Sequence, residues 1–397
     1  MRDNTRFLFI IVLMCAIGMI TTDIYIPLLP QIGTDFSSSQ HSLQLTLSVY
    51  LFGLSLSQLI YGPLSDRYGR KPIILLGMSI FLVASLSCML SSSIEMFIAS
   101  RLLQAIGACS GMVIGRVMVS DIYTKQESAK VFTIIFPIIG MSPAISPMIG
   151  GLIGEFTNWR AVFALVTLLA IILLSMVTLY LNETKPKKDR VSIHHKTVLK
   201  HYAELFFNKQ FWYYTSIVCF AYIAYFGYIS ESPFLFHHFN YTTSDISFFY
   251  ITLSLSYLLG NQAAKYCLSK MSIDSSIFVG YFFFSLGGVM FILLNYGLKF
   301  TPFNLIFPAT ILTFGNGFLL PLGTAGVVSS FEHISGYASG MMGAIQLVCA
   351  SLSVYFVGIL SKYNITSFST YMLTITVTGF VIFLFISPTV HEFKKRA

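Results

Sequence analysis

Apolar runs of about twenty residues follow one another along almost the whole chain. A run of about 20 apolar residues forms a helix long enough to cross the roughly 30 Å hydrocarbon layer of a bilayer. A soluble core does not need this much apolar sequence, and only 10% of the 397 residues are charged. A membrane β-barrel would show short alternating strands instead. The sequence therefore predicts an all-α membrane protein.

The apolar runs number twelve and fall into two groups of six. Their approximate ranges are 7–30, 43–63, 72–92, 96–118, 131–154, 160–181, 211–235, 246–268, 275–297, 303–327, 336–360 and 368–388. The longest connection, 182–210, predicts a cytoplasmic linker between an N-terminal bundle (1–181) and a C-terminal bundle (211–397). Leu54–Gln58 matches Leu253–Tyr257 at an offset of 199 residues, about half the chain. Two pseudo-symmetric six-helix bundles around a midplane site are a transporter architecture.

Lysine and arginine residues gather in alternate connections. Nineteen of the 24 lie at the termini, in the linker or in one set of loops, whereas the opposite loops hold Arg160, Lys299 and Lys362. Cytoplasmic loops carry the excess of basic residues, so we expect both termini and the linker to be cytoplasmic. The net charge of +8 follows from this asymmetry and does not argue for nucleic-acid binding. No small-residue cleavage site follows the first run, which we interpret as a retained span.

The residues that bind metals, phosphates and disulfide partners show no useful spacing. The six cysteines are scattered in apolar surroundings without a C-x-x-C pair, which is typical of packing residues. The histidines form no ligand array, so we expect no metal site. A phosphate-binding G-x-x-x-x-G-K-[ST] motif is absent from the sequence, which argues against ATP hydrolysis and against an enzyme.

A polar stretch, Gly62–Pro72, separates the second and third spans. It holds two glycines, two prolines, one acid and three bases, and we interpret it as a very tight loop at a membrane face. Gly62 would let neighbouring helices approach closely. Gly69 would permit a backbone turn that a side chain hinders.

This stretch resembles the loop between spans two and three of the major facilitator superfamily, G-x-x-x-D-R-x-G-R-[KR]. The residues that fit are Gly62, Asp66, Arg67, Gly69, Arg70 and Lys71. The resemblance implies the major facilitator fold and a loop that latches the two halves together. Asp66 would then meet the positive N-terminal end of span eleven, near residues 336–340. Asp121 would pair with the bases of the loop; alternatively, Arg116 and Asp121 are an interfacial base and a helix-end acid.

Further stretches resemble the Bcr/CflA group of drug:proton antiporters in this superfamily. They are Thr22–Pro30 (T-D-x-Y-x-P-x-x-P), Arg101–Gly107 (R-x-x-Q-x-x-G), Ser142–Gly151, Tyr228–Phe234 and Gly315–Gly317. Ser146 stands where the wider span-five motif has glycine. The resemblance implies a monomer in the bacterial inner membrane. It would export small, largely apolar compounds, such as chloramphenicol- or bicyclomycin-like drugs, in exchange for protons, with the proton gradient as energy source and no cofactor.

Asp23 and Arg101 are the candidates for proton coupling, because an ionisable residue inside a span is costly and usually functional. At 1.5 Å per residue, Asp23 lies roughly 24 Å from the cytoplasmic edge and Arg101 roughly 6 Å below the outer edge. These depths coincide in a core of ~30 Å. We therefore expect protonation of Asp23 to release Arg101 and deprotonation to let the two pair. Alternatively, Asp23 caps a helix broken near Pro27 and Arg101 extends toward the outer surface.

Two other sets of residues complete the candidate site. Pro143, Pro147, Gly150 and Gly151 lie in one span, where they predict a fixed bend that disfavours leak, or generic kinked packing. Possible cavity residues are Tyr25, Gln104, Tyr225, Tyr228, Glu231 and Asn316. For Glu231 we favour an acid at the outer interface over a second protonation or cation-binding site.

The sequence leaves two alternatives to multidrug efflux. One is a proton-coupled carrier of a dedicated metabolite or siderophore, which the same motifs would serve. The other is a membrane receptor or assembly factor that transports nothing, against which the latch motif, the kink motif and Asp23 argue. For the transporter we expect a small-molecule substrate, protons and the lipid bilayer as partners.

Overall fold

The computed structural model describes residues 2–186, 190, 195–296, 301–360 and 365–386, and these residues contain helices but no strand. Several sequence predictions fall outside them. These are linker residues 187–189 and 191–194, the loop residues Lys299 and Lys362, the end of the last predicted span at 387–388 and the C-terminal bases Lys394, Lys395 and Arg396.

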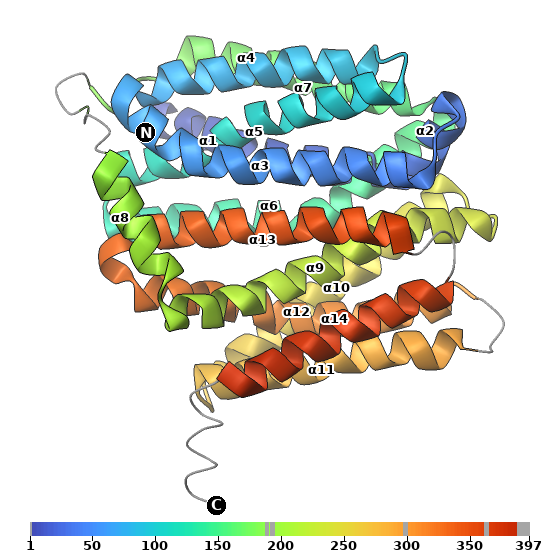
Figure 1. Ribbon diagram of the computed structural model, residues 1–397. Coiled ribbons are helices and arrows are strands. Elements are labelled where there is room, and N and C mark those ends of the chain that lie inside the picture. Colours follow the sequence, from blue (N-terminus) through green and yellow to red (C-terminus); the bar gives the residue numbers. More distant parts are fainter. Residues whose placement is uncertain (1, 187–189, 191–194, 297–300, 361–364, 387–397) are drawn as a thin grey trace, which may run out of the picture. The chain divides into compact units, whose positions relative to one another are not determined.

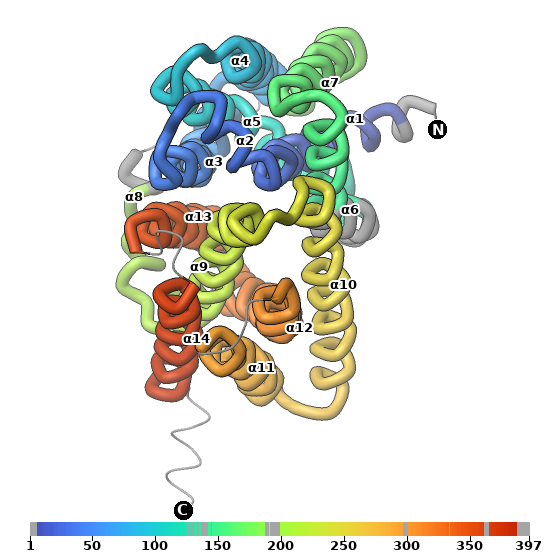
Figure 2. Tube along the Cα trace, turned by 90° about the vertical axis from the view of Figure 1, so that its right-hand side faces the viewer, coloured from blue at the N-terminus to red at the C-terminus, as the bar shows by residue number. Residues whose placement is uncertain are grey.

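The first compact unit comprises residues 1–198 and 242–247. Its elements are α1 (Arg2–Asp23), the short 3-10 helix η1 (Ile26–Leu28), α2 (Leu29–Phe36), α3 (Gln40–Tyr68), α4 (Arg70–Met89), α5 (Ile94–Ile122), α6 (Lys125–Phe156) and α7 (Trp159–Tyr180). Helix α5 packs against α1, α3 and α4, while α4 also contacts α7 and α1 also contacts α6. Figures 1 and 2 show these helices from two directions.

The second compact unit comprises residues 199–241 and 248–397. The remaining elements are α8 (His195–Phe206), α9 (Lys209–His238), α10 (Thr243–Leu268), α11 (Ile273–Asn295), α12 (Phe303–Ser330), η3 (Glu332–Ile334), α13 (Ser335–Leu360) and α14 (Ile365–Ile386). In this unit α11 packs against α12 and α14, and α9 packs against α12, α13 and α14. The pairs α4–α5, α4–α7, α1–α5, α1–α6 and α1–α7 thus recur six spans later.

The described residues form twelve long helical segments in the order that the apolar runs predict, if α1, η1 and α2 count as one segment. Within the described part of the chain, nine of them are long and apolar enough to span a membrane by length and composition alone. The other three, α6, α9 and α10, have 32, 30 and 26 residues. Helix α9 is rich in tyrosine, whose hydroxyl groups lower its mean hydropathy.

Side-chain caps explain where several helices begin. The Ser93 hydroxyl accepts a hydrogen bond from the Met96 backbone N–H at the start of α5. At the start of α6, Thr124 and Glu127 each accept a hydrogen bond from the other's backbone N–H. Such caps satisfy donors that the first turn of a helix leaves unpaired.

The stretch Gly62–Pro72 is more helical than the sequence predicts. Helix α3 continues through Pro63 to Tyr68 and α4 begins at Arg70, so Gly69 alone separates them. The loop interpretation was therefore too long. Asp66 and Arg70 are four residues apart and form an ion pair of 2.9 Å across the turn, which favours the compact arrangement.

The two glycines of this stretch, Gly62 and Gly69, differ in backbone conformation and in the space around them. Gly69 has a φ of 101°, which confirms the predicted turn that needs glycine. At Gly62 a Cβ atom would meet no heavy atom within 4 Å among the residues that the structure describes. No close approach of helices at Gly62 is therefore present among the described residues of its own unit, and the predicted approach stays a prediction.

The two units repeat one tight helix contact. A Cβ atom on Gly107 of α5 would lie 2.6 Å from the Cα of Phe81 and 2.7 Å from the Gly77 carbonyl oxygen, both in α4. A Cβ atom on Gly315 of α12 would lie 3.0 Å from the Cα of Phe284 and 2.7 Å from the Gly280 oxygen, both in α11. Gly77 and Gly280, like Phe81 and Phe284, are 203 residues apart. The internal duplication is therefore visible in backbone packing as well as in hydropathy.

The same register applies to α3 and α10 and corrects the sequence match. The thiol of Cys109 donates to the Leu54 carbonyl oxygen at 3.4 Å. At the equivalent place in the second unit, a Cβ atom on Gly317 would lie 2.6 Å from the Tyr257 oxygen. Leu54 and Tyr257 are 203 residues apart. The predicted offset of 199 is wrong by four residues, about one helical turn, because a match of five residues is too short to set the register of two helices.

Replacing Gly107 with valine should destabilise the protein, since the added side chain would meet the Phe81 backbone, which cannot rotate away. Overpacking of this kind costs about 1–3 kcal/mol. We expect a lower midpoint of thermal unfolding in detergent, followed by fluorescence-detected size exclusion.

The matched control is Gly62→Ala, which places a Cβ atom in open space within a helix. It should leave the midpoint unchanged or raise it, since alanine favours helix over glycine. Equal loss of stability in both variants would contradict the packing interpretation.

Candidate functional site

The first span breaks at Asp23. Helix α1 ends there, and Pro27 lies in the first turn of the short 3-10 helix η1 that follows. The hydroxyl groups of Thr21 and Thr22 donate back to the carbonyl oxygens of Ile17 and Gly18, at 2.6 and 2.8 Å. Asp23 is 1% exposed. A carboxyl group is thus buried at the point where the backbone leaves the helix.

Helix α6 supplies the hydrogen-bond donor to Asp23. The Ser142 hydroxyl lies 3.1 Å from Asp23 Oδ2 and donates to it. The Ser142 and Ser146 hydroxyls are 3.2 Å apart, one helical turn from each other. Ser146, the residue that departs from the family pattern, is therefore joined to Asp23 through Ser142.

The kink residues of α6 lie beside the same break. A Cβ atom on Gly150 would overlap the Ile24 carbonyl oxygen, so α6 rests directly on the backbone next to Asp23. Gly151 and Pro147 are buried and Pro143 is half-buried. Helix α6 is continuous through both prolines. The fixed bend stays a prediction. The close approach of α6 to the Ile24 carbonyl leaves no room for a side chain at position 150, which explains the glycine there.

Arg101 of α5 is fully buried in the same unit. Its Nη1 donates to the Thr21 carbonyl oxygen at 3.2 Å and to Gln104 Oε1 at 2.7 Å. The guanidinium carbon lies 4.2 Å from the ring centre of Tyr25 and 4.0 Å from that of Tyr50. Desolvated contacts of this kind each stabilise a cation by roughly 2 kcal/mol.

The tyrosines around Arg101 are themselves anchored. Tyr50 of α3 donates through its hydroxyl to the Gly18 carbonyl oxygen at 2.9 Å. The Tyr25 hydroxyl and Thr46 Oγ1 are 3.0 Å apart. The Gln104 amide nitrogen donates to Ser85 at 2.9 Å. Gln104 and Tyr25, predicted as possible cavity residues, are thus buried in the network that holds Arg101.

Asp23 and Arg101 come close without pairing. Arg101 bonds to the carbonyl of Thr21, two residues before Asp23. No ion pair within 4.0 Å joins Asp23 to Arg101 among the side chains that the structure describes. Arg101 does not extend toward the outer surface, as the alternative interpretation required, because its guanidinium group is fully buried. The helix break at Asp23, which that alternative also predicted, is present.

The predicted residues of the second unit are also mostly buried. Tyr228 is 3% exposed and its ring lies 6.1 Å from that of Phe291 and 6.4 Å from that of Phe368. Asn316 is 1% exposed and donates to the Ala221 carbonyl oxygen at 3.4 Å. Tyr225 is half-buried. Helix packing therefore accounts for Tyr228.

Glu231 is fully buried within α9. The favoured interpretation as an acid at the outer interface was therefore wrong, since an interfacial carboxylate would reach solvent. The neighbouring Ser232 lies 2.8 Å from the Tyr250 hydroxyl of α10, so this part of α9 is packed against another helix.

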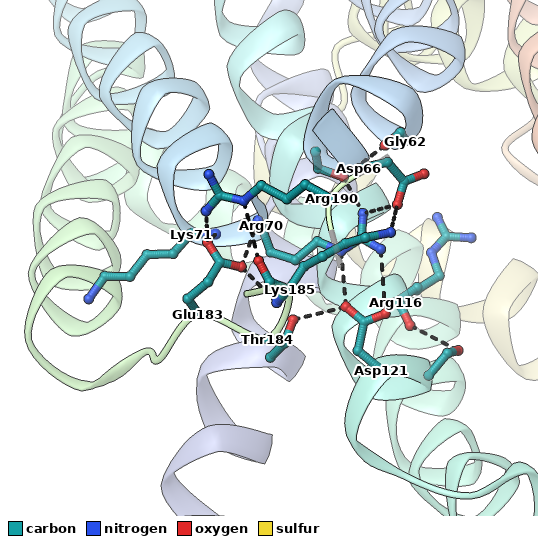
Figure 3. Close-up of polar contacts among 12 residues, drawn as sticks. Gly62, Asp66, Arg70, Lys71, Arg116, Asp121, Glu183, Thr184, Lys185 and Arg190 are labelled. Carbon is teal, nitrogen blue, oxygen red and sulfur yellow. Dashed lines mark hydrogen bonds and ion pairs between the residues drawn. The ribbon is translucent and has the colours of Figure 1, made fainter. Parts of the chain in front are cut away.

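A second polar cluster lies where α3 meets α4, and Figure 3 shows its side chains. Arg70 is at its centre and is 3% exposed. Its Nε donates to Asp121 Oδ2 at 2.9 Å, and its Nη1 lies 2.9 Å from Asp66 Oδ1. Nη1 also donates to Ser65 at 2.7 Å. The predicted contact of Asp121 with a base of the motif is therefore present.

The segment that follows α7 completes the cluster. The Lys185 ammonium lies 2.6 Å from Asp66 Oδ1, and the Thr184 hydroxyl donates to Asp121 Oδ2 at 2.9 Å. Glu183 accepts hydrogen bonds from the backbone N–H groups of Arg70 and Lys71, at 2.9 and 3.3 Å. A carboxylate is favourable at the N-terminus of a helix, here that of α4.

Sequence reasoning missed this segment, Glu183–Lys185, and also Tyr50. An acid, a hydroxyl and a base directly after the sixth span were a usable signal for the segment. Nothing in the sequence distinguished Tyr50 from other aromatic residues. Of the remaining motif residues, Lys71 donates to the Thr178 carbonyl oxygen at 3.0 Å, whereas Arg67 is exposed and lies over the Tyr68 ring at 5.1 Å. Arg116 donates to the Met112 carbonyl oxygen of its own helix at 2.9 Å.

The helices and buried charges define a multi-span α-helical membrane protein. The model of the Major Facilitator Superfamily matches residues 8–354, and the chain therefore belongs to this superfamily. It is a transporter rather than an enzyme, and such transporters need no cofactor. Within the described residues, no group of three or more His, Cys, Asp and Glu side chains is placed to hold a metal ion.

Individual relatives agree with this assignment. The chain is 28% identical to Multidrug resistance protein D of Escherichia coli (strain K12), over 89% of either chain. It is 32% identical to an uncharacterized MFS-type transporter, YdgK, of Bacillus subtilis (strain 168), over 59% of either chain. The human organic anion transporter MFSD10 (TETRAN) has the same fold, with a TM-score of 0.67 at 16% identity, covering 96% of this chain and 99% of that one. The predicted family and the predicted major facilitator fold are confirmed.

Replacing Arg70 with alanine should destabilise the first unit, because Asp66 and Asp121 both lose their shared partner. Asp66 is 42% exposed and Asp121 21% exposed, so both carboxylates can rehydrate in part. We expect a loss of about 2 kcal/mol, the range for hydrogen bonds to charged groups. The thermal midpoint in detergent should fall by roughly 5 °C.

Arg67→Ala is the matched control, since Arg67 is exposed and lies outside this network. Its midpoint should change by less than about 1 °C, as surface substitutions usually do. An equal fall in both variants would mean that the network around Arg70 does not stabilise the protein.

Proposed function

We propose that this protein is a proton-coupled antiporter that exports small, largely apolar compounds by alternating access. The observation that carries the proposal is the carboxyl group of Asp23, buried at a helix break close to the buried Arg101. An ionisable pair inside membrane spans is costly and marks an ion or proton pathway in transporters. The similarity to a protein named for multidrug resistance supports drug-like substrates.

The contacts of Asp23 and Arg101 suggest how protons are coupled to transport. With Asp23 protonated, its charge is neutralised, and Arg101 is held by Thr21, Gln104 and the two tyrosine rings. With Asp23 ionised, attraction draws the guanidinium group toward the carboxylate. Substrate and proton then compete for one region of the protein, and this competition makes exchange obligatory.

The latch belongs to the same proposal. Arg70, Asp66, Asp121 and the segment Glu183–Lys185 form one network, which ties the end of α5 and the start of the linker to the junction of α3 and α4. We propose that Asp66 also meets the N-terminal end of α13 in one conformation. Lys185 already pairs with Asp66, so it would compete with this contact.

Topology completes the proposal. The excess of lysine and arginine in alternate loops supports cytoplasmic termini in a bacterial inner membrane. A bundle of residues 1–181 and one of 211–397, joined by the linker 182–210, would rock about a midplane site. We propose that the monomer transports and that the proton gradient drives it.

A second candidate is a proton-coupled carrier of a dedicated metabolite or siderophore. Pump-deficient cells separate the two. A multidrug exporter lowers the accumulation of several unrelated compounds only while the proton gradient is intact, whereas a dedicated carrier changes the uptake or export of one compound class.

Asp23→Asn should abolish transport driven by a pH gradient, because the amide cannot take up and release a proton. The measurement is acidification or alkalinisation of everted membrane vesicles on addition of substrate, together with drug accumulation in cells. Variant protein must reach the membrane at the level of the native protein.

Glu155→Gln is the control, since Glu155 is an exposed carboxyl group of the same unit at the end of α6. It should retain pH-dependent efflux. If Asp23→Asn also retained efflux that collapses with the pH gradient, Asp23 would not be the coupling residue.

Tyr50 gives a test of how Arg101 is held. Tyr50→Phe keeps the ring over the guanidinium group and loses the hydroxyl with its hydrogen bond to Gly18, so efflux should fall less than twofold. Tyr50→Leu removes the ring, whose contact with a desolvated cation is worth roughly 2 kcal/mol, and efflux should fall about tenfold. Equal activity of both variants, at equal expression, would contradict the role of the ring.

A further inference from the structure

A groove lies on the surface of the first unit between α1 and α7. Arg6, Phe9 and Ile10 of α1 and Met176 and Tyr180 of α7 form its walls, and its volume is about 430 Å³. Phe9 is 56% exposed and Tyr180 55% exposed, so the groove opens outward from the helices. Both helices are long and apolar enough to span a membrane, and an exposed apolar opening on such helices suits a lipid chain.

One end of the groove lies at the ends of its two helices. Arg6 lies in the second turn of α1, which begins at Arg2, and Tyr180 is the last residue of α7. A basic residue and an aromatic residue near the end of a membrane span are typical of headgroup depth. Phe9 and Met176 line the part of the groove farther along the helices, whereas Ile10 is fully buried.

Arg6 gives this end of the groove its charge. Among the side chains that the structure describes, it is the one charged residue of the lining, and it is exposed. Its guanidinium carbon lies 5.9 Å from the Tyr180 ring centre. No carboxylate within 4.0 Å pairs with it among the residues that the structure describes. A cation at headgroup depth above an apolar groove complements a phosphate attached to an acyl chain.

We propose that this groove binds an anionic phospholipid, with the headgroup phosphate on Arg6 and one acyl chain along Phe9 and Met176. The net positive charge of the lining favours a lipid with net negative charge over a zwitterionic one. On the topology proposed above, the lipid belongs to the inner leaflet. A lipid there would brace α1 against α7 on the helix that carries Asp23.

Native mass spectrometry of the delipidated full chain in detergent tests this site. The probes are dioleoyl phosphatidylglycerol and dioleoyl phosphatidylethanolamine at equal concentrations. The native protein should bind the first more tightly, and Arg6→Gln should weaken that binding about fivefold, the effect of one basic residue near an anionic surface. Binding of phosphatidylethanolamine should hardly change.

Two further variants separate the contribution of the lipid headgroup to binding from that of the acyl chain. Met176→Trp fills the groove and should reduce binding of both lipids. Arg67→Gln is the matched control, because Arg67 also lies over a tyrosine ring, at 5.1 Å, but outside the groove. It should bind phosphatidylglycerol as the native protein does. Equal binding of both lipids by the native protein, unchanged binding in Arg6→Gln, or the same loss in Arg67→Gln would each overturn the site.

Discussion

A guanidinium group buried among membrane spans must be satisfied by the protein, and Arg101 determines much of the first unit for this reason. Water cannot reach it, so its charge is stabilised by two tyrosine rings, the Gln104 side chain and the Thr21 carbonyl oxygen. These groups come from α1, α3 and α5. The need to hold one cation thus fixes how three helices meet, and it brings the broken end of α1 beside α5.

Arg70 meets a similar need at the junction of α3 and α4. It is almost as buried as Arg101, but two carboxylates face it, Asp66 and Asp121, and both retain some exposure. The charge of Arg70 is therefore balanced locally, and the network extends through Lys185 and Thr184 into the start of the linker. Under the proposed function, Arg70 belongs to a structural site and Arg101 to a switchable one. Arg70 forms ion pairs with Asp66 and Asp121. Arg101 lies near Asp23, whose carboxylate accepts a hydrogen bond from Ser142 instead.

The fold could be predicted from the sequence because hydropathy and a short polar motif depend on local chemistry. Twelve apolar runs became twelve long helices, and Gly69 took the positive φ that the motif predicts. The extent of helix around that motif was missed, since Asp66 and Arg70 stabilise the last turn through an ion pair that composition cannot reveal. The 199-residue offset failed because a match of five residues is too short to set the register of two helices.

Candidate residues were predictable where they were unusual for a membrane span, and not where their role depends on packing. Asp23 and Arg101 stood out as charges in apolar runs. Their failure to form an ion pair, and the part of Tyr50, depend on side-chain directions that spacing does not give. Glu231 was misplaced because distance along a helix measures depth but not whether neighbouring helices cover the residue.

Helix α6 contacts both the carboxylate of Asp23 and the backbone of the helix break that follows it. At Ser142 it donates a hydrogen bond to Asp23, and two turns later Gly150 rests on the Ile24 carbonyl with no room for a side chain. A sliding or rotation of α6 therefore changes the hydrogen bond to Asp23 and the packing on the helix break together. Conversely, a change of charge on Asp23 alters what holds α6 in place. Under the proposed function, the glycine and the serine of one motif thus couple the proton site to the position of α6 through direct contact, without a longer pathway.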